Sequence, residues 1–382
     1  MSTEKSSISG AYGRISAPTM LRAGLIGLPS TGKTTLFQLL TGGHPDAPAG
    51  KSGKFGRADA QIGVSPVPDP RLDRLTALFE PKKHASATVT FADLAGSAAA
   101  RSIIDLSTYR DADALLHVVR AFRADDVPHV SETVDPGRDA RAVEDELILA
   151  DLSVAEKRLD RIKHDRKKGA SKELDLEAAV IERCRTHLEE GLPIRGLDLD
   201  PAAAKVLRGF QFLSAKPLLL VINLDEADIH EAERAAELTG LGDVLVDTHT
   251  RAVGVCAKIE LEIAQLEAGD AKEFMADLGL EAPGLDRVIK AAYDLLGYIS
   301  FFTVGKDECR AWSIPKGTKA QQAAGEIHTD IERGFIRAEV VGCEPLLQRG
   351  TIAACRDKAE VRLEGKEYLV KDGDVINFRF AT

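Results

Sequence analysis

The sequence has few cysteines and no motif that would pair them. Its five cysteines are scattered along 382 residues, with no CxxC pair and no histidine cluster at metal-ligand spacing. An odd, dispersed set of thiols argues against a disulfide framework and against a structural zinc site. We therefore expect reduced thiols and a cytoplasmic protein.

Long apolar runs are also missing. The longest is Leu218 to Ile222, which is far too short to cross a bilayer. Residues 1–21 are rich in Ser, Gly and Thr and lack the apolar core of a signal peptide, so we expect a flexible N-terminal tail. The formal net charge of −10 argues against general coating of DNA or of an anionic membrane. We therefore expect neither a membrane protein nor a DNA-binding protein.

Short apolar strands alternate with helical segments over much of the chain. Near-continuous apolar strands separated by helices are typical of a parallel sheet that is covered on both faces. The sequence therefore predicts an α/β domain in two parts, at residues 22–124 and 206–298. We expect its strands at residues 23–27, 88–92, 114–119, 218–222 and 244–246.

Two regions of the sequence have other patterns, one inserted within the α/β domain and one following it. Between residues 125 and 205, two amphipathic runs flank Gly169-Ala170-Ser171, which predicts an inserted antiparallel helical hairpin or short coiled coil. Residues 299–382 carry short alternating strands separated by Gly and Pro, which predicts a small α+β domain with one helix near 320–332. The apolar positions of the hairpin are Ile148, Leu152, Ala155, Leu159 and Ile162, then Leu174, Ala178, Ile181, Cys184 and Leu188.

Residues Gly27 to Thr34 fit the pattern G-x-x-x-x-G-K-[ST] between an apolar strand and an amphipathic helix. In this P-loop, backbone N–H groups cradle phosphate oxygens, Lys33 adds positive charge, and the Thr34 hydroxyl ligates Mg²⁺. The helix that follows contributes its positive N-terminal dipole end. We expect the phosphates to lie against Gly27, Pro29, Ser30, Thr31, Gly32, Lys33, Thr34 and Thr35.

A second acidic group is expected to hold Mg²⁺ through water. Asp93 directly follows the strand at residues 88–92 and is the candidate; a helix N-cap or turn is the alternative. Lys33, Thr34 and Asp93 are therefore the predicted catalytic residues, with Thr34 and Asp93 as the metal ligands.

The segment Asn223-Leu224-Asp225-Glu226 follows the strand at residues 218–222. GTP-binding P-loop proteins carry N-K-x-D at this point, and their Asp accepts hydrogen bonds from N1–H and the 2-amino group of guanine. Here Glu226 replaces that Asp and Leu224 replaces the Lys, which favours ATP over GTP. Asn223 with Glu226 three positions later also fits a helix capping pair, and both roles can hold at once.

These motifs, in this order, resemble those of the YchF / Obg-like ATPase family, and the resemblance covers almost the whole chain. Its most specific part is C-terminal, where Phe302-Thr303-Val304-Gly305 and Arg310-Ala311-Trp312-Ser313-Ile314-Pro315 resemble the family's TGS domain. Cys256-Ala257-Lys258 stands where the family has Ser-Ala-Lys, whose backbone N–H groups help read the base. The resemblance implies a P-loop domain, a coiled-coil arm and a TGS domain, with slow ATP hydrolysis. It also implies association with the ribosome or ribosomal RNA.

Three segments depart from the family pattern. Ser30-Thr31 stands where the family has Asn-Val, Arg57 stands where it has a switch Thr, and the segment from Ser97 to Arg101 is several residues shorter. A switch Thr normally completes the Mg²⁺ shell, so we expect intact binding with weak hydrolysis. Two alternatives remain open: a nucleotide-gated binding switch with little or no turnover, and a GTPase on the same scaffold.

The basic run at residues 163–168 lies near the expected tip of the hairpin. It could contact the phosphate backbone of ribosomal RNA. It could equally be solvated charge that complements a helix C-terminus. The sequence leaves both interpretations open.

Overall fold

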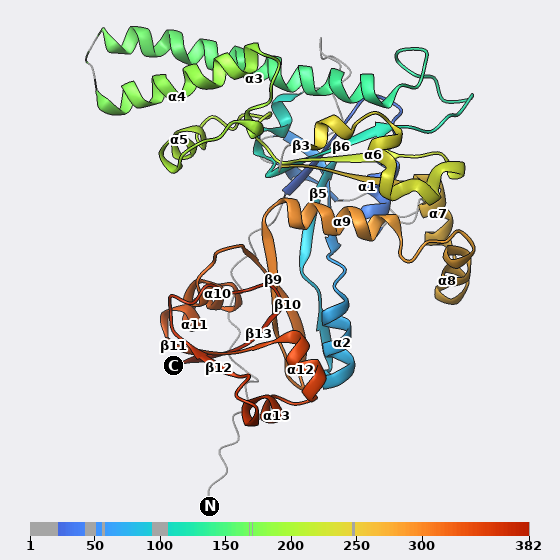
Figure 1. Cartoon of the computed structure of the whole chain (residues 1–382), viewed down its shortest axis with the longest axis vertical. Coiled ribbons are helices and arrows are strands. Elements are labelled where there is room, and N and C mark those ends of the chain that lie inside the picture. Colours follow the sequence, from blue (N-terminus) through green and yellow to red (C-terminus); the bar gives the residue numbers. More distant parts are fainter. Residues whose placement is uncertain are drawn as a thin grey trace, which may run out of the picture. The chain divides into compact units, whose positions relative to one another are not determined.

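A computed structural model describes residues 22–42, 51–55, 58–93, 106–167, 169, 171–246 and 249–381. The predicted tail at residues 1–21, Arg57 and the segment from Ser97 to Arg101 lie outside this part of the chain. The chain divides into two compact units (Figure 1). The larger combines Leu21–Val67 with Val89–Leu296, and the smaller combines Pro68–Thr88 with Gly297–Thr382.

A seven-stranded sheet of order β2-β3-β5-β1-β6-β7-β8 forms the centre of the larger unit. Its strands from β5 to β8 are mutually parallel, while β2 and β3 form an antiparallel hairpin at one edge. This arrangement confirms the predicted α/β fold with a parallel sheet. The strands are β1 Arg22–Ile26, β2 Lys51–Phe55, β3 Ala58–Pro66, β5 Thr88–Asp93, β6 Ala114–Arg120, β7 Leu218–Asn223 and β8 Thr250–Val255.

The prediction of a strand at residues 244–246 is wrong. These residues belong to a 3-10 helix, η4 (Gly242–Val246), and the strand beside β7 is β8. A Cβ at Gly254 of β8 would lie 2.5 Å from the carbonyl oxygen of Ala232, so close packing of the neighbouring helix η3 (Glu226–Arg234) requires glycine there. A glycine within a strand weakens the apolar pattern that predicts strands. The more apolar residues 244–246 were therefore predicted as the strand instead of Thr250–Val255.

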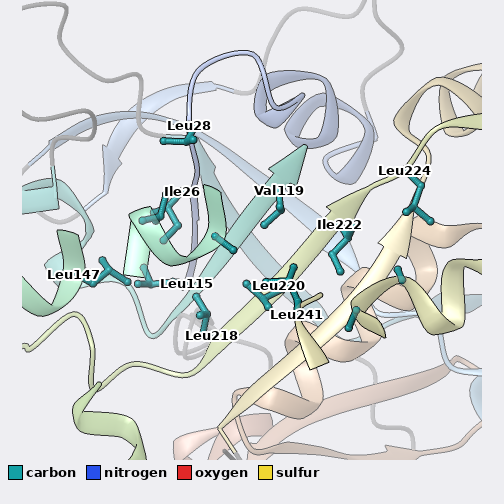
Figure 2. Packing of buried hydrophobic residues seen from close by; sticks show 14 of the residues in the cluster. Ile26, Leu28, Leu115, Val119, Leu147, Leu218, Leu220, Ile222, Leu224 and Leu241 are labelled. Atoms are coloured by element: carbon teal, nitrogen blue, oxygen red, sulfur yellow. The ribbon is translucent and has the colours of Figure 1, made fainter. Parts of the chain in front are cut away.

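The main core of this unit gathers apolar side chains of β1, β6 and β7 around the base of a long helix, α3 (Pro136–Arg166) (Figure 2). Leu28 of the loop after β1 belongs to this core together with Leu147 of α3. Both are almost completely buried. The P-loop and the first half of α3 therefore share one packed core. Burial of each such side chain stabilises the fold by roughly 2 kcal/mol.

The predicted helical hairpin is present. Helix α3 packs along α4 (Lys172–Glu189), and Ser171 caps α4 by accepting a hydrogen bond from the Leu174 N–H. Asp135 caps α3 in the same way, with Pro136 as the first helical residue. Side chains from both helices form a separate core that continues into η2 (Ile194–Gly196) and α5 (Pro201–Leu207). We call α3 and α4 the arm.

The other helices of the larger unit are shorter, and no helix among the described residues is long and apolar enough to cross a membrane. They are α1 Lys33–Leu40, η1 Leu106–Asp111, α6 Ala235–Leu238, α7 Ala257–Gln265, α8 Ala268–Asp277 and α9 Gly284–Leu295.

The smaller unit is an α+β structure built on a six-stranded sheet of order β12-β11-β13-β9-β10-β4. The helix expected at residues 320–332 is divided by His328, whose extended backbone (φ −164°, ψ 141°) ends α10 and starts α11. The His328 Nδ1 accepts a hydrogen bond from the Asp330 N–H at 3.2 Å and so caps α11. The strands are β4 Lys83–Ala85, β9 Tyr298–Thr303, β10 Glu308–Pro315, β11 Phe335–Gly342, β12 Arg362–Glu364 and β13 Asp374–Phe380. The helices are α2 Pro70–Phe79, α10 Ala320–Ile327, α11 Thr329–Arg333, α12 Cys343–Arg349 and α13 Ile352–Asp357.

The structure differs from the sequence-based boundaries at residues 68–88, which were assigned to the α/β domain. Strand β4 pairs in parallel with β10, and the Arg71 Nη1 of α2 bonds the Asp372 Oδ2 at 2.7 Å. The Arg71 guanidinium also lies 5.3 Å from the centre of the Phe302 ring. Arg71 and Asp372 are 301 positions apart, a separation that no local pattern can bridge.

Candidate functional site

The loop between β1 and α1 needs glycine at both glycine positions of its motif. Gly27 has a φ of 145° and Gly32 a φ of 92°, values that L-residues rarely adopt. A Cβ at Gly27 would lie 2.5 Å from the Val118 carbonyl oxygen, and one at Gly32 would lie 2.6 Å from the Asn223 Nδ2. The loop therefore packs directly against the ends of β6 and β7.

Lys33 begins α1 and turns back over this loop. Its Nζ donates to the carbonyl oxygens of Gly27 at 2.9 Å and of Leu28 at 2.6 Å. The hydroxyl of buried Thr31 also donates to the Leu28 oxygen, at 3.1 Å. Burial lowers the pKa of Lys33, and the nearby charge of Asp93 opposes that shift. The cationic group of the motif thus lies in a partly desolvated position at the loop.

The three predicted catalytic side chains meet at one edge of the sheet. Strands β1 and β5 are parallel neighbours, so the start of α1 and the end of β5 lie together. The Thr34 Oγ1 donates to the Asp93 Oδ2 at 3.2 Å. Burial raises the pKa of Asp93, while the Thr34 hydrogen bond and the charge of Lys33 oppose that rise. A hydroxyl and a carboxylate side by side offer the oxygen ligands that Mg²⁺ prefers.

Asn223 at the end of β7 ties three segments together. Its Nδ2 donates to the Thr31 carbonyl oxygen at 3.1 Å, and its Oδ1 accepts from the Ala257 N–H at 3.0 Å. Cys256, which precedes Ala257, is buried and is the N-cap residue of α7. The predicted base-side segments at 223–226 and 256–257 are therefore joined to the P-loop by one amide side chain.

The residues after Asn223 have three different surroundings. The buried Leu224 packs in the main core, and its N–H donates to the Val255 oxygen at 2.7 Å. The Asp225 Oδ2 accepts from the Arg123 N–H at 3.2 Å. Glu226 forms an ion pair with Lys258 in the first turn of α7. Asp225 is the N-cap residue of η3, so Asn223 and Glu226 do not form the capping pair that was the alternative interpretation.

The other predicted phosphate-binding residues lie on the same loop and helix. Pro29 and Ser30 are exposed at the turn, and Ser30 has a positive φ of 61°. Thr35 is half-buried in the first turn of α1. Together with Lys33 and Thr34, they place polar groups and loop backbone on one end of the sheet.

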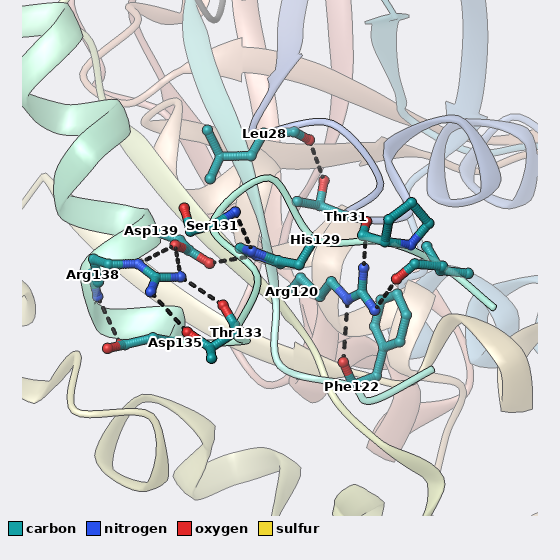
Figure 3. A network of polar contacts seen from close by, with 12 residues as sticks. Leu28, Thr31, Arg120, Phe122, His129, Ser131, Thr133, Asp135, Arg138 and Asp139 are labelled. Atoms are coloured by element: carbon teal, nitrogen blue, oxygen red, sulfur yellow. Dashed lines mark hydrogen bonds and ion pairs between the residues drawn. The ribbon is translucent and has the colours of Figure 1, made fainter. Parts of the chain in front are cut away.

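A polar network connects the end of β6 to the root of the arm (Figure 3). Arg120 is 1% exposed and donates to the carbonyl oxygens of Val127 at 2.9 Å and Phe122 at 3.3 Å. Its guanidinium lies 4.5 Å from the centre of the Phe122 ring. The His129 Nε2 lies 2.8 Å from the Asp139 Oδ2 in the first turn of α3. The loop that leads into the arm is thus fixed from both sides.

Sequence reasoning missed the partners that hold the site. Arg120 was not among the candidate residues, and Lys258 entered only as the last residue of the Cys256-Ala257-Lys258 motif. A charged residue that ends a largely apolar strand is the one signal that could have indicated Arg120. Nothing in the sequence joins Lys258 to Glu226, because the two residues are 32 positions apart in different segments.

Comparison with known proteins places this geometry in a family. The chain is 40% identical over 366 residues to the "Ribosome-binding ATPase YchF" of Bacillus subtilis, covering 94% of this chain and 99% of the relative. It is 39% identical over 365 residues to the protein of the same name from Escherichia coli O157:H7, with the same coverage. The chain belongs to the YchF family. Its predicted membership is therefore confirmed.

Two further comparisons cover the fold and the C-terminal region. The "Structure of the Schizosaccharomyces pombe YchF GTPase" matches 97% of this chain and 99% of that chain, with a TM-score of 0.80 and 29% identity. The YchF-GTPase_C family model, described as "Protein of unknown function (DUF933)", matches residues 298–381. Bacterial YchF proteins are thus named ATPases and the yeast structure a GTPase, so the names alone do not decide the nucleotide.

Proposed function

We propose that this YchF-family protein binds ATP with Mg²⁺, hydrolyses it slowly, and acts as a ribosome-associated regulator in the cytoplasm. The observation that carries the proposal is the Thr34 hydroxyl, 3.2 Å from the Asp93 carboxylate and beside Lys33 on a P-loop. The names of the bacterial relatives support both the ATPase activity and the ribosome association.

The phosphates would lie against the loop from Gly27 to Thr34. Lys33 would exchange its two carbonyl partners for phosphate oxygens, which as anions are stronger acceptors. Thr34 and Asp93 would hold Mg²⁺, whose charge neutralises the phosphates during transfer. Since no group of three or more His, Cys, Asp or Glu side chains suited to a metal occurs in the described part of the chain, phosphates and water would complete its shell.

The choice of ATP rests on the segment after β7. Glu226 replaces the guanine-reading Asp of N-K-x-D, and Leu224 replaces its Lys. Leu224 is buried in the main core, so a lysine could not take its place without burying a charge. A GTPase on this scaffold is therefore disfavoured.

A binding switch with little or no turnover is the second candidate. The shortened segment after Gly96 and the Arg at position 57 favour it, because both replace groups that normally support hydrolysis. Measured turnover separates it from the first proposal.

The arm and the TGS-like unit are the proposed contacts with the ribosome or its RNA. At the arm's tip, Lys163 pairs with Asp160 at 3.1 Å and Arg166 with Asp175 at 2.7 Å. These pairs reduce the net charge of the tip. If the tip contacts RNA, charge reversal at Arg166, Lys167 and Lys168 should still weaken ribosome pelleting, because it removes positive charge that faces phosphate. Unchanged pelleting would rule out the tip as an RNA contact.

The test combines binding and turnover. We expect Lys33→Ala to weaken ATP binding about ten- to hundredfold, because charged hydrogen bonds to phosphate are lost. Thr34→Ala should remove most of the Mg²⁺ dependence, whereas Thr41→Ala at the other end of α1 is the control. Phosphate release is then followed with and without ribosomes. Slow release that ribosomes stimulate supports the proposal; no release in either condition would make the protein a binding switch.

A further inference from the structure

Glu226 and Lys258 form an ion pair at the base side of the site. Glu226 begins η3 just after β7, and Lys258 lies in the first turn of α7. The Lys258 Nζ donates to the Glu226 Oε1. The Glu226 side chain is 47% exposed and the Lys258 side chain 66% exposed, so a nucleotide base could reach both.

The backbone around this pair is fixed relative to the P-loop. Asn223, three residues before Glu226, bonds both the Thr31 oxygen and the Ala257 N–H. Leu224 bonds the Val255 oxygen at 2.7 Å. The segments that carry Glu226 and Lys258 are therefore held to each other and to the phosphate loop, and the pair has a defined place in the site.

We propose that Lys258 is a positioning residue that sets purine selectivity by holding and neutralising the Glu226 carboxylate. The inference rests on the proposed nucleotide site. A free carboxylate at this position offers two acceptor oxygens that match the N1–H and 2-amino donors of guanine. Lys258 occupies one of these acceptors and cancels the charge, so the pairing with guanine is opposed.

Adenine has no corresponding donors at N1 and C2, so it gains nothing from a free carboxylate at those positions. Lysine removal should therefore favour GTP specifically. The loss of a positive charge should also make the site more negative, which weakens the binding of both nucleotides equally. The informative quantity is thus the ratio of the two dissociation constants, in which the shared electrostatic effect cancels.

The experiment measures the dissociation constants of ATP and GTP with Mg²⁺ for the full-length chain and three variants. Lys258→Met should shift the Kd ratio toward GTP by up to about fivefold, the upper end of the range expected for an exposed ion pair. Lys258→Met with Glu226→Gln should restore the wild-type ratio, because the freed carboxylate is gone. Lys290→Met is the matched control, since it removes an exposed lysine that pairs with Asp294 inside α9.

The outcomes are distinct. An unchanged ratio in Lys258→Met, or a shift that persists in the double variant, overturns this inference while leaving an ATP-preferring site in place. Tighter GTP than ATP binding by the wild type overturns the proposed function and this inference with it. Equal melting temperatures among the variants confirm that the comparison is made between folded proteins.

Discussion

His117 lies fully buried in the middle of β6, where protonation is strongly disfavoured. Burial, followed by the positive charges of Lys33 and Arg195, lowers its pKa from 6.5 to about 3. Between pH 6.5 and about pH 3, the imidazole is therefore protonated in the unfolded chain but neutral in the folded chain. The stability that this neutral imidazole supplies is complete above pH 6.5 and is lost as the pH falls toward 3.

We expect the free energy of unfolding to fall by about 1.4 kcal/mol per pH unit below pH 6.5 because of this group. His117→Leu should flatten that dependence, since leucine does not titrate. The measurement is urea unfolding of both proteins at pH 7.5 and pH 5. Equal losses of stability in the two proteins would show that other groups cause the acid sensitivity.

Two arginines of α2 pair with acidic side chains elsewhere in the smaller unit. Arg71 bonds its own N-cap residue, Asp69, at 2.8 Å and Asp372 at 2.7 Å. Its side chain is 25% exposed, and that of Asp69 is 9% exposed. Arg74, one turn along the same helix, pairs with Glu344 where both side chains are about half exposed.

The two arginines should therefore differ in their effect on stability. Arg71→Ala should cost about 1–3 kcal/mol, because it leaves the largely buried Asp69 carboxylate without its ion-pair partner. Arg74→Ala should cost less than about 1 kcal/mol, as exposed ion pairs do. Hydrogen exchange of the α2 amides in both variants measures the difference. Similar exchange in the two variants would show that Arg71 stabilises α2 no more than Arg74 does.

The smaller unit contains a segment from earlier in the chain that lies outside the matched C-terminal family region. The matched family region is residues 298–381, whereas the unit also contains α2 and β4 from residues 68–88. Without them, β10 loses its parallel partner β4, and Asp372 loses Arg71. Two chain crossings, at Val67–Pro68 and Thr88–Val89, also link this unit to strands β3 and β5 of the larger one.

We expect a fragment of residues 297–382 to melt at a lower temperature than the same fragment mixed with a peptide of residues 68–88. The peptide restores strand β4 and the Arg71–Asp372 ion pair, and it stabilises the fold by mass action. A peptide carrying Arg71→Ala should give a smaller shift. Calorimetry of the three samples provides the measurement. If the peptide has no effect, α2 and β4 are not an integral part of this unit.

The sequence by itself determined the local chemistry of this protein. The P-loop spacing, the apolar strands and the two amphipathic runs of the arm each depend on neighbours a few positions apart, so pattern sufficed. Strand β5 likewise placed Asp93 at its end. Where a strand required a glycine, as at Gly254, the local signal failed.

Only the tertiary structure decided which distant groups meet. It joined Asn223 to Thr31 and Ala257, paired Glu226 with Lys258, and placed α2 in the C-terminal unit. These contacts depend on how strands are ordered in a sheet and on loops that close over long separations. Hydrophobic periodicity records which face of an element is buried, but it does not record what that face is buried against.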